Sequence, residues 1–155
     1  MSDPSQTVSI RPATTADVDR LVEFQKAMAA ETEDKGLDPD RLRAGIEYLI
    51  DHPDEGFYLM AERHGDSAGS LMVTFEWSDW RNGRFWWIQS VYVDADHRRQ
   101  GVYSALHAAI RRQAEEDPQG CGIRLYVEVE NENAQTTYRQ LGMAETHYRL
   151  YEEEF

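Results

Sequence analysis

The sequence predicts an α/β domain in which helices cover both faces of a sheet of mixed strand direction, giving three layers. Short segments alternate apolar with polar residues, as half-buried strands do, and longer segments repeat apolar residues every three or four positions, as amphipathic helices do. Proline, glycine and an Asn–Gly pair separate these segments. In chain order they give the pattern β-α-α-β-β-β-α-β-α-β.

The first part of the chain carries clear start and stop signals. A strand over residues 8–12 precedes Thr14–Asp17, whose threonine and aspartate have the spacing of a capping box at a helix start. Asp38 and the proline after it begin a second helix, which ends before Pro53. Residues 31–36 between the two helices are acidic and are predicted to be a flexible connection.

The remaining elements follow the same patterns. Strands are predicted over residues 57–63, 68–77, 85–93, 123–129 and 146–152, and helices over residues 102–116 and 132–141. Turns are predicted around Gly65-Asp66 and at Asn82-Gly83, the second of which is typical of a tight hairpin. Gly142 suits the left-handed position that ends a helix.

Length and composition predict one globular domain over residues 1–155. The single Cys121 cannot form an intrachain disulfide, and the first residues lack the basic and apolar regions of a secretion signal, so a cytoplasmic protein is expected. No apolar run approaches the roughly 20 residues that span a bilayer. The net charge of −13 argues against nucleic acid or an anionic membrane as a partner. It is compatible with a cationic amine substrate, and also with a simple role in solubility.

The segment from Val91 to Leu106 is the most informative part of the sequence. It predicts a strand, a polar loop, one glycine and a helix, so the unpaired N–H groups of the first helical turn point at one spot that attracts an anion. Arg98 and Arg99 add positive charge, and the arrangement suits a pyrophosphate. An ordinary strand-to-helix connection has the same outline and stays an alternative. The glycine pattern excludes a P-loop and a dinucleotide fingerprint.

Three segments resemble the GNAT superfamily of N-acyltransferases. Residues 98–103 (RRQGVY) are similar to its acyl-CoA pyrophosphate loop, R/Q-x-x-G-x-G/A, except that Tyr103 stands where the pattern has Gly or Ala. Residues 131–143 are similar to the element N-x-x-A-x-x-x-Y-x-x-L-G-F/M, and residues 9–17 to the usual first strand and helix start. The resemblance covers nearly the whole chain. It implies the three-layer α/β/α acyl-CoA N-acyltransferase fold with a mixed, mostly antiparallel central sheet.

The resemblance implies acetyl-CoA as co-substrate, and the scattered His and Cys residues show no metal-ligand spacing. The implied cofactor-binding residues are Val91, Tyr92, Val93, Arg98, Arg99, Gln100, Gly101, Val102, Tyr103, Ser104, Asn131 and Ala134. Backbone N–H groups of residues 98–104 would hold the pyrophosphate, and the edge of the strand at residues 90–93 would pair with the pantetheine amides. In the family, a bulge and a splay from the strand predicted over residues 123–129 open this groove.

By the same resemblance, Tyr138 is the candidate catalytic residue, a general acid that protonates the leaving thiolate. Half-buried helix packing is the alternative for any such tyrosine. Asn131 would cap its helix and hydrogen-bond the cofactor or a water, two roles that are compatible.

The acceptor side is less defined. Many family members place a glutamate on the central strand as a base, but Gln89 cannot serve as one. Glu31, Glu33 or a water held by Gln89 and a backbone carbonyl are the candidates. Trp77 and Asp79 belong to an aromatic-rich hairpin that either lines the acceptor site or makes cross-strand pairs and a contact in a homodimer.

The function predicted is direct, acetyl-CoA-dependent transfer of an acetyl group to a primary amine, with a small molecule favoured as acceptor. A non-catalytic acyl-CoA sensor is the main alternative. A dimerisation module without a cofactor is a third.

Overall fold

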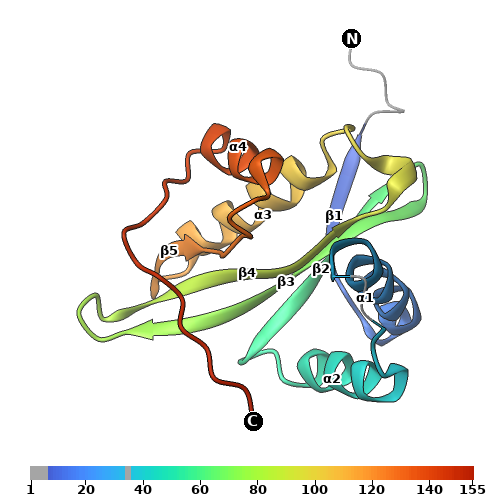
Figure 1. Cartoon of the computed structure of the whole chain (residues 1–155), viewed down its shortest axis with the longest axis horizontal. Helices are drawn as coiled ribbons and strands as arrows, with labels where there is room; N and C mark the ends of the chain where they lie inside the picture. Colours follow the sequence, from blue (N-terminus) through green and yellow to red (C-terminus); the bar gives the residue numbers. More distant parts are fainter. Residues whose placement is uncertain (1–6, 34–35) are drawn as a thin grey trace. The chain divides into compact units, whose positions relative to one another are not determined.

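The protein, described here as a computed structural model over residues 7–33 and 36–155, divides into two compact units, Met1–Leu125 and Tyr126–Phe155. The elements of the first unit are β1 (Val8–Pro12), η2 (Thr15–Asp17), α1 (Val18–Glu33), α2 (Pro39–Asp51), β2 (Gly56–Arg63), β3 (Asp66–Ser78), β4 (Gly83–Val93), η3 (Ala95–His97), α3 (Val102–Glu116) and β5 (Gly120–Arg124). The second unit contains α4 (Glu132–Gln140). Figure 1 follows these elements along the chain.

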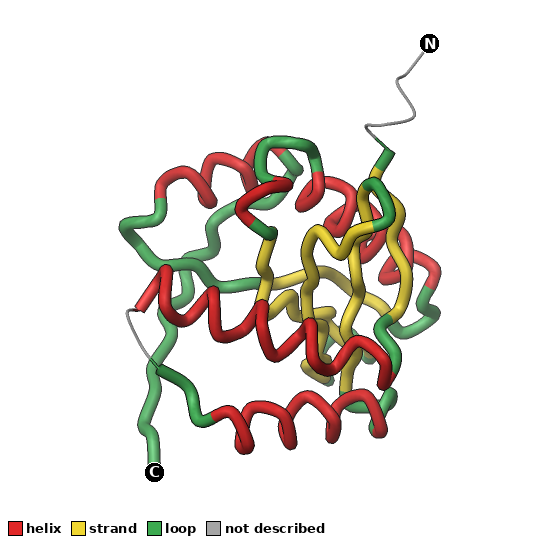
Figure 2. The backbone as a smooth tube through the Cα atoms, turned by 90° about the vertical axis from the view of Figure 1, so that its right-hand side faces the viewer, coloured by secondary structure: helices red, strands yellow, loops and turns green. Residues whose placement is uncertain are grey.

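The sheet of the first unit has five strands in the order β1-β2-β3-β4-β5. Its neighbours pair antiparallel except β4 and β5, which are parallel. Helices α1 and α2 lie side by side across one face of the sheet (Figure 2), and α3 covers the other. The predicted three layers and the mixed, mostly antiparallel sheet are confirmed.

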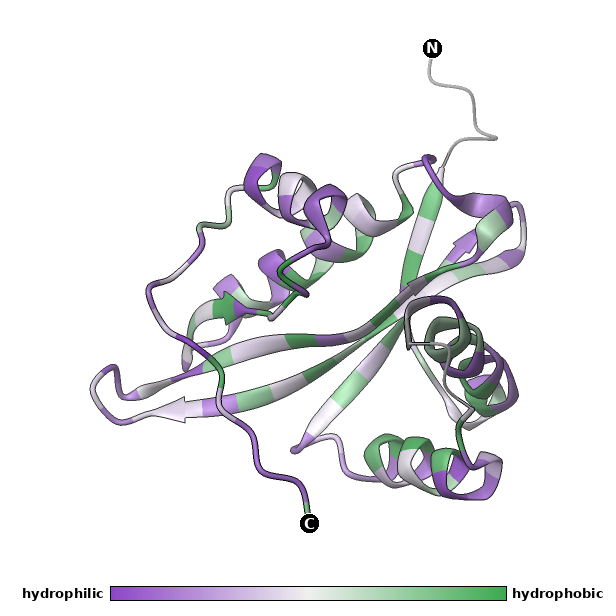
Figure 3. Ribbon diagram, in the orientation of Figure 1, coloured by the Kyte–Doolittle hydropathy of each residue, from purple (hydrophilic) through white to green (hydrophobic). Residues whose placement is uncertain are grey.

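Each face of the sheet has its own hydrophobic cluster. The cluster under α3 includes Leu71, Val73, Trp86, Ile88, Leu106 and Ile110. The cluster under α1 and α2 includes Leu21, Phe24, Ile46, Met60 and Tyr92. Figure 3 shows hydrophobic and hydrophilic residues alternating along the ribbons of α1 and α2, as expected for helices with one buried face.

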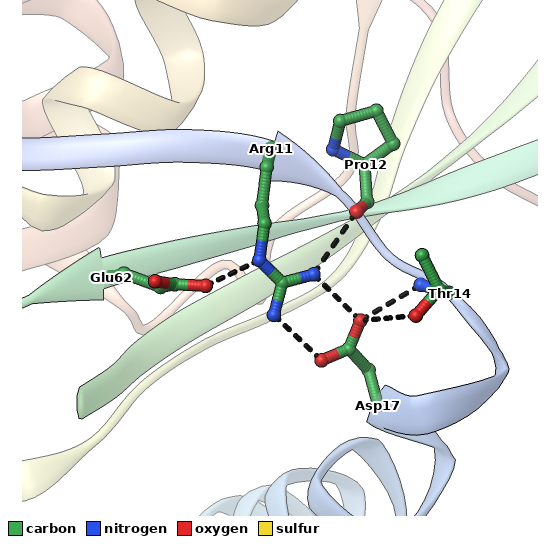
Figure 4. A network of polar contacts seen from close by, with 5 residues as sticks. All are labelled: Arg11, Pro12, Thr14, Asp17 and Glu62. Atoms are coloured by element: carbon green, nitrogen blue, oxygen red, sulfur yellow. Dashed lines mark hydrogen bonds and ion pairs between the residues drawn. The ribbon is translucent and has the colours of Figure 1, made fainter. Parts of the chain in front are cut away.

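A polar network fastens the start of α1 to the sheet (Figure 4). Arg11 of β1 donates to both carboxylate oxygens of Asp17, at 2.7 and 2.8 Å, and also to Glu62 of β2. The Asp17 carboxylate accepts in addition from the backbone N–H of Thr14 at 2.8 Å, which fulfils the predicted cap. Asp17 is only 7% exposed, so this network joins three elements at a buried point.

The Asp17→Asn variant is expected to lower the free energy of unfolding by about 1–3 kcal/mol at pH 7, because Arg11 loses one of its two charged partners. The Arg11 guanidinium holds the pKa of Asp17 below its ordinary value of 3.8. A depressed pKa in the folded state adds stability above the unfolded value, and that stability disappears as the pH falls through the folded value. Urea unfolding at pH 7 and pH 2.5 should therefore show the difference between wild type and variant shrinking in acid. Asp19→Asn, at an ion pair whose aspartate is 85% exposed, is the control and should change little.

Several predicted boundaries differ from the structure. Residues 31–33 belong to α1 and not to a flexible connection, while residues 34 and 35 lie outside the described part. The first hairpin turns at His64 and Gly65, both with positive φ, one residue earlier than predicted. The strand predicted over residues 123–129 ends at Arg124, and residues 146–152 form no strand.

The two strand errors have one physical cause. A strand requires a neighbouring backbone to pair with, whereas the alternation of apolar and polar residues predicts only that one face is buried. Within residues 126–155 α4 is the one regular element, so the alternating side chains of Tyr148 and Leu150 stay 68% exposed.

Candidate functional site

A bulge in β4 sets the geometry of the site. Met72 of β3 pairs with Gln89, but Ser70 pairs with Tyr92, so β4 carries one extra residue there. Ser90, at φ +50°, supplies the irregular backbone. Because of it, Ile88 and then Val91 pack toward the α3 cluster, and Tyr92 turns to the α1 side.

At the bulge and on both sides of it, one edge of β4 is left open. The pairing of β4 with β5 begins at Arg84 with Gly120 and ends at Trp87 with Arg124. From Ile88 to Val93, no strand in the described part of the chain pairs with β4 on this side. Such an edge can pair with an extended ligand chain through backbone hydrogen bonds, which is the geometry that the family resemblance implies for pantetheine.

The loop after β4 forms a cradle of backbone N–H groups. Arg99 and Gly101 both have left-handed backbone, at φ +61° and +78°. The N–H of Ala105 donates to the carbonyl of Gly101 at 3.0 Å, so the first turn of α3 before Ala105 presents N–H groups without intrahelical acceptors. A Cβ added at Gly101 would have no atom within 4 Å, so no other residue packs against this position. This set of backbone donors fits a pyrophosphate.

The Arg98 side chain bonds to β4 and α1. Its Nε donates to the carbonyl of Val93 at 3.0 Å, and its Nη2 donates to Glu31 Oε2 at 2.7 Å. Its guanidinium also lies over the Tyr92 ring, 5.6 Å from the centroid. The hydrogen bond with Glu31 raises the pKa of Arg98. Arg98, whose charge was predicted to help bind the pyrophosphate, is thus paired with a carboxylate in the last turn of α1.

Other loop side chains also bind the scaffold. Arg63 at the end of β2 donates to Gln100 Oε1 at 3.3 Å and lies 3.4 Å from His97 Nδ1. The Tyr103 hydroxyl lies 3.2 Å from Nδ1 of His107, one turn further along α3. Burial, and secondarily the charge of Arg111, lowers the pKa of His107. The Tyr103 ring therefore lies along α3, which accommodates the departure from the small residue of the family pattern.

On the α1 side of the sheet, the structure brings two of the predicted acceptor residues near the bulge. The Tyr92 hydroxyl donates to Glu31 Oε1 at 3.2 Å, and burial followed by the charge of Glu31 raises the pKa of Tyr92. Gln89 Nε2 donates to Thr74 Oγ1 across the strand pair. The backbone of Glu33 is in α1, but its side chain lies outside the described residues.

Trp77 and Asp79 are not brought to this place. Trp77 pairs with Arg84 at the hairpin end of β4, five residues or roughly 16 Å from Gln89. Trp77 lies two residues after Phe75 in β3 and therefore points to the same face of the sheet, toward α3. Gln89 points to the opposite face. Asp79 accepts from the N–H of Trp80 within the hairpin loop at 2.8 Å.

The second unit carries the remaining motif residues. Asn131 Oδ1 accepts from the N–H of Ala134 at 3.1 Å, which confirms the predicted cap of α4. Gly142 has φ +94° and its N–H donates to the Arg139 carbonyl at 3.1 Å, which confirms the predicted C-cap. Burial raises the pKa of the Tyr138 phenol above its ordinary value of 10.0. The phenol is therefore protonated at neutral pH.

Sequence reasoning missed Arg63 and Thr74, whose partners lie 37 and 15 residues away along the chain. No local signal marks such partners, because the sheet register creates the contact. Among residues 7–33 and 36–155, no three His, Cys, Asp or Glu side chains are grouped to hold a metal ion. In the same residues, no helix has the length and apolarity needed to cross a membrane.

Comparison with known proteins connects this geometry to a family. The profile of the acetyltransferase (GNAT) family matches residues 20–143. A possible acetyltransferase from Clostridium difficile 630 shares 42% sequence identity with a TM-score of 0.89, covering 96% of this chain and 97% of that one. No curated protein sequence matches the chain significantly.

Two other solved structures share the fold at lower identity. The aminoglycoside N-acetyltransferase AAC(6')-Iy in complex with CoA has 17% identity and a TM-score of 0.80, covering 96% of this chain and 95% of that one. Glucosamine-6-phosphate N-acetyltransferase from Arabidopsis thaliana has 20% identity and a TM-score of 0.72, covering 95% and 98%. The profile match and the identity to the Clostridium protein establish that this chain belongs to the acetyltransferase (GNAT) family.

Proposed function

We propose that this protein is an N-acetyltransferase that transfers an acetyl group directly from acetyl-CoA to the primary amine of a small molecule. The observation that carries the proposal is the open edge of β4 next to a cradle of backbone N–H groups at the start of α3. Edge and cradle follow one another in the chain, so one extended ligand can pair with the strand and place its phosphates at the helix terminus.

The family match supports acyl transfer, and two neighbours with the same fold support the finer assignment. AAC(6')-Iy was solved with CoA and with a bisubstrate analogue, CoA-S-monomethyl-acetylneamine. The plant neighbour is named for glucosamine-6-phosphate, so both act on small molecules. We infer a small amine acceptor here as well. The family profile spans both units, which supports one acetyltransferase domain over residues 1–155.

Each part of the site would then have a defined task. Acetyl-CoA supplies the acetyl group as a thioester. Backbone N–H groups of residues 101–104 would hold the pyrophosphate, and the N–H of Val91, beyond the bulge, would polarise the thioester carbonyl. Tyr138 would donate a proton to the sulfur as the amine displaces it. The last role follows from the motif position of Tyr138.

The acceptor amine must also lose a proton. Both carboxylate oxygens of Glu31 already accept hydrogen bonds, from Tyr92 and from Arg98, which weakens the case for Glu31 as the base. The Gln89 amide is oriented by its bond to Thr74, on the sheet face that carries Tyr92. We propose that a water held by Gln89 and a backbone carbonyl takes the proton and passes it to bulk water.

We also infer a cytoplasmic location, which suits the single Cys121, a free thiol.

Incubation of the purified protein with acetyl-CoA and a panel of primary amines tests the function. Release of free thiol should depend on both the protein and one class of amine, and mass spectrometry should find the acetylated product. Binding of acetyl-CoA by calorimetry without turnover on any amine would instead indicate a sensor. Absence of binding at high micromolar acetyl-CoA would contradict both functions.

A further inference from the structure

The last turn of α1 is fastened to the cofactor loop through a single carboxylate. Glu31 Oε2 accepts from Arg98 at 2.7 Å and Glu31 Oε1 accepts from the Tyr92 hydroxyl at 3.2 Å. These contacts join residues 67 and 61 positions apart in sequence. Glu31 thus connects α1 with both the strand that offers its edge and the loop that forms the cradle.

Arg98 donates to two groups of the protein itself. One donor holds the carbonyl of Val93, the last residue of β4, and another holds Glu31. The next residue, Arg99, adopts left-handed backbone at φ +61°, a conformation unfavourable for a residue with a side chain. A fixed Arg98 therefore holds the strained turn that leads to Gly101 and sets the direction of the cradle N–H groups.

We propose that Glu31 and Arg98 are positioning residues that hold the pyrophosphate cradle in its binding shape, and that Arg98 is not a direct phosphate ligand. This inference rests on the proposed function in one respect, because it takes acetyl-CoA as the molecule that occupies the cradle. It also predicts that the last turn of α1 responds to binding of the cofactor.

Simple electrostatics predicts the opposite effect of removing Glu31. CoA is a polyanion, so a nearby carboxylate repels it, and the Glu31→Gln variant would free the charge of Arg98 for the phosphates. If charge were the main effect, this variant would bind acetyl-CoA more tightly. If Glu31 acts by holding Arg98, the variant binds more weakly. The sign of the change separates the two roles.

Isothermal calorimetry with acetyl-CoA measures that sign. We expect Glu31→Gln to raise the dissociation constant about threefold to fivefold, as for loss of one half-exposed ion pair. Tyr92→Phe, which removes the other donor, should raise it by a smaller factor. The matched control is Glu23→Gln, which removes the same charge from an exposed ion pair two turns earlier in α1 and should change the constant less than about twofold.

A double-mutant cycle completes the binding test. Arg98→Gln should weaken binding, and combining it with Glu31→Gln should add little, because both changes release the same contact. Equal or tighter binding by Glu31→Gln, or additive losses in the double variant, would overturn the proposal. Both side chains of the pair are nearly half exposed, at 45% and 44%, so folding of the variants is expected to match the wild type in a thermal melt.

Hydrogen exchange gives a second readout that needs no acceptor. Saturating CoA should slow amide exchange in the last turn of α1 in the wild type and leave it unchanged in Glu31→Gln. Slowing to the same extent in both proteins would contradict the coupling. A wild type that fails to bind acetyl-CoA would refute the proposed function, whereas a wild type that binds, together with an unaffected Glu31→Gln, would refute this inference alone.

Discussion

Replacing Tyr138 with Phe is expected to lower kcat by about tenfold or more, because the reaction expels a thiolate that a nearby acid must protonate. The dissociation constant of acetyl-CoA should change little, since a general acid acts in the transition state and not in binding. Burial raises the pKa of the Tyr138 phenol. The phenol therefore stays protonated at neutral pH, as a proton donor requires.

The measurement is thiol release under saturating acetyl-CoA and amine, with calorimetry on the same samples. Tyr148→Phe is the matched control, because this tyrosine lies in the same unit and is 68% exposed, and it should turn over like the wild type. The pH profile adds a signature that lost packing would not give. On the alkaline side, wild-type kcat should fall as the pH rises through the elevated pKa of Tyr138, and the Phe variant should lack that descending limb. Unchanged turnover in Tyr138→Phe would remove Tyr138 from the mechanism.

Elements governed by local chemistry were predictable from the sequence. The start of α2 depends on the Asp38 side chain, which accepts from the N–H groups of Asp40 and Arg41, all within four residues. The start of α3 depends on Gly101, which adopts φ +78°. The end of α4 depends on Gly142 in the same region of backbone conformation. In each case one short stretch contains both the signal and the group that it satisfies.

The bulge in β4, the end of β5 and the open strand edge depended on pairing partners that sequence patterns do not identify. The bulge at Ser90 has φ +50° on a residue that is not glycine, so the pairing with β3 imposes it and local preference does not. The end of β5 at Arg124 likewise follows from where pairing with β4 stops. The sequence therefore predicted that the strand and the loop exist. It did not show that the strand edge opens beside the cradle.

The side chains of the site show the same division. The motif placed Arg98 in the cofactor loop, and its charge suggested a phosphate ligand. The structure pairs it with Glu31, which is 67 residues away, and with the carbonyl of Val93. A long, flexible cation can reach either an anionic ligand or an acidic helix end, and only the tertiary fold determines which partner lies within reach. Backbone donors carry no such ambiguity, since the chain path fixes their direction.

Gly101→Val is expected to raise the dissociation constant of acetyl-CoA by about 100-fold. Valine is branched at Cβ and is strained at φ +78°, so the loop must leave its left-handed conformation and redirect the N–H groups that follow it. Loss of two hydrogen bonds to a charged phosphate costs about 3 kcal/mol, which corresponds to that factor. Calorimetry with acetyl-CoA and with free CoA measures the loss, and both ligands should lose affinity to the same extent because they share the pyrophosphate.

Strain alone would also destabilise the protein, so the control must carry the same strain elsewhere. Gly65 has φ +79° and, like Gly101, no atom within 4 Å of a built Cβ, but it lies in the hairpin between β2 and β3. Gly65→Val and Gly101→Val should therefore lower the free energy of unfolding by similar amounts, while only the second loses affinity for CoA. Equal affinities in the two variants would show that the N–H groups at the start of α3 do not bind the pyrophosphate. The cradle would then be an ordinary strand-to-helix connection, and the assignment of this end of the sheet to acetyl-CoA would fail with it.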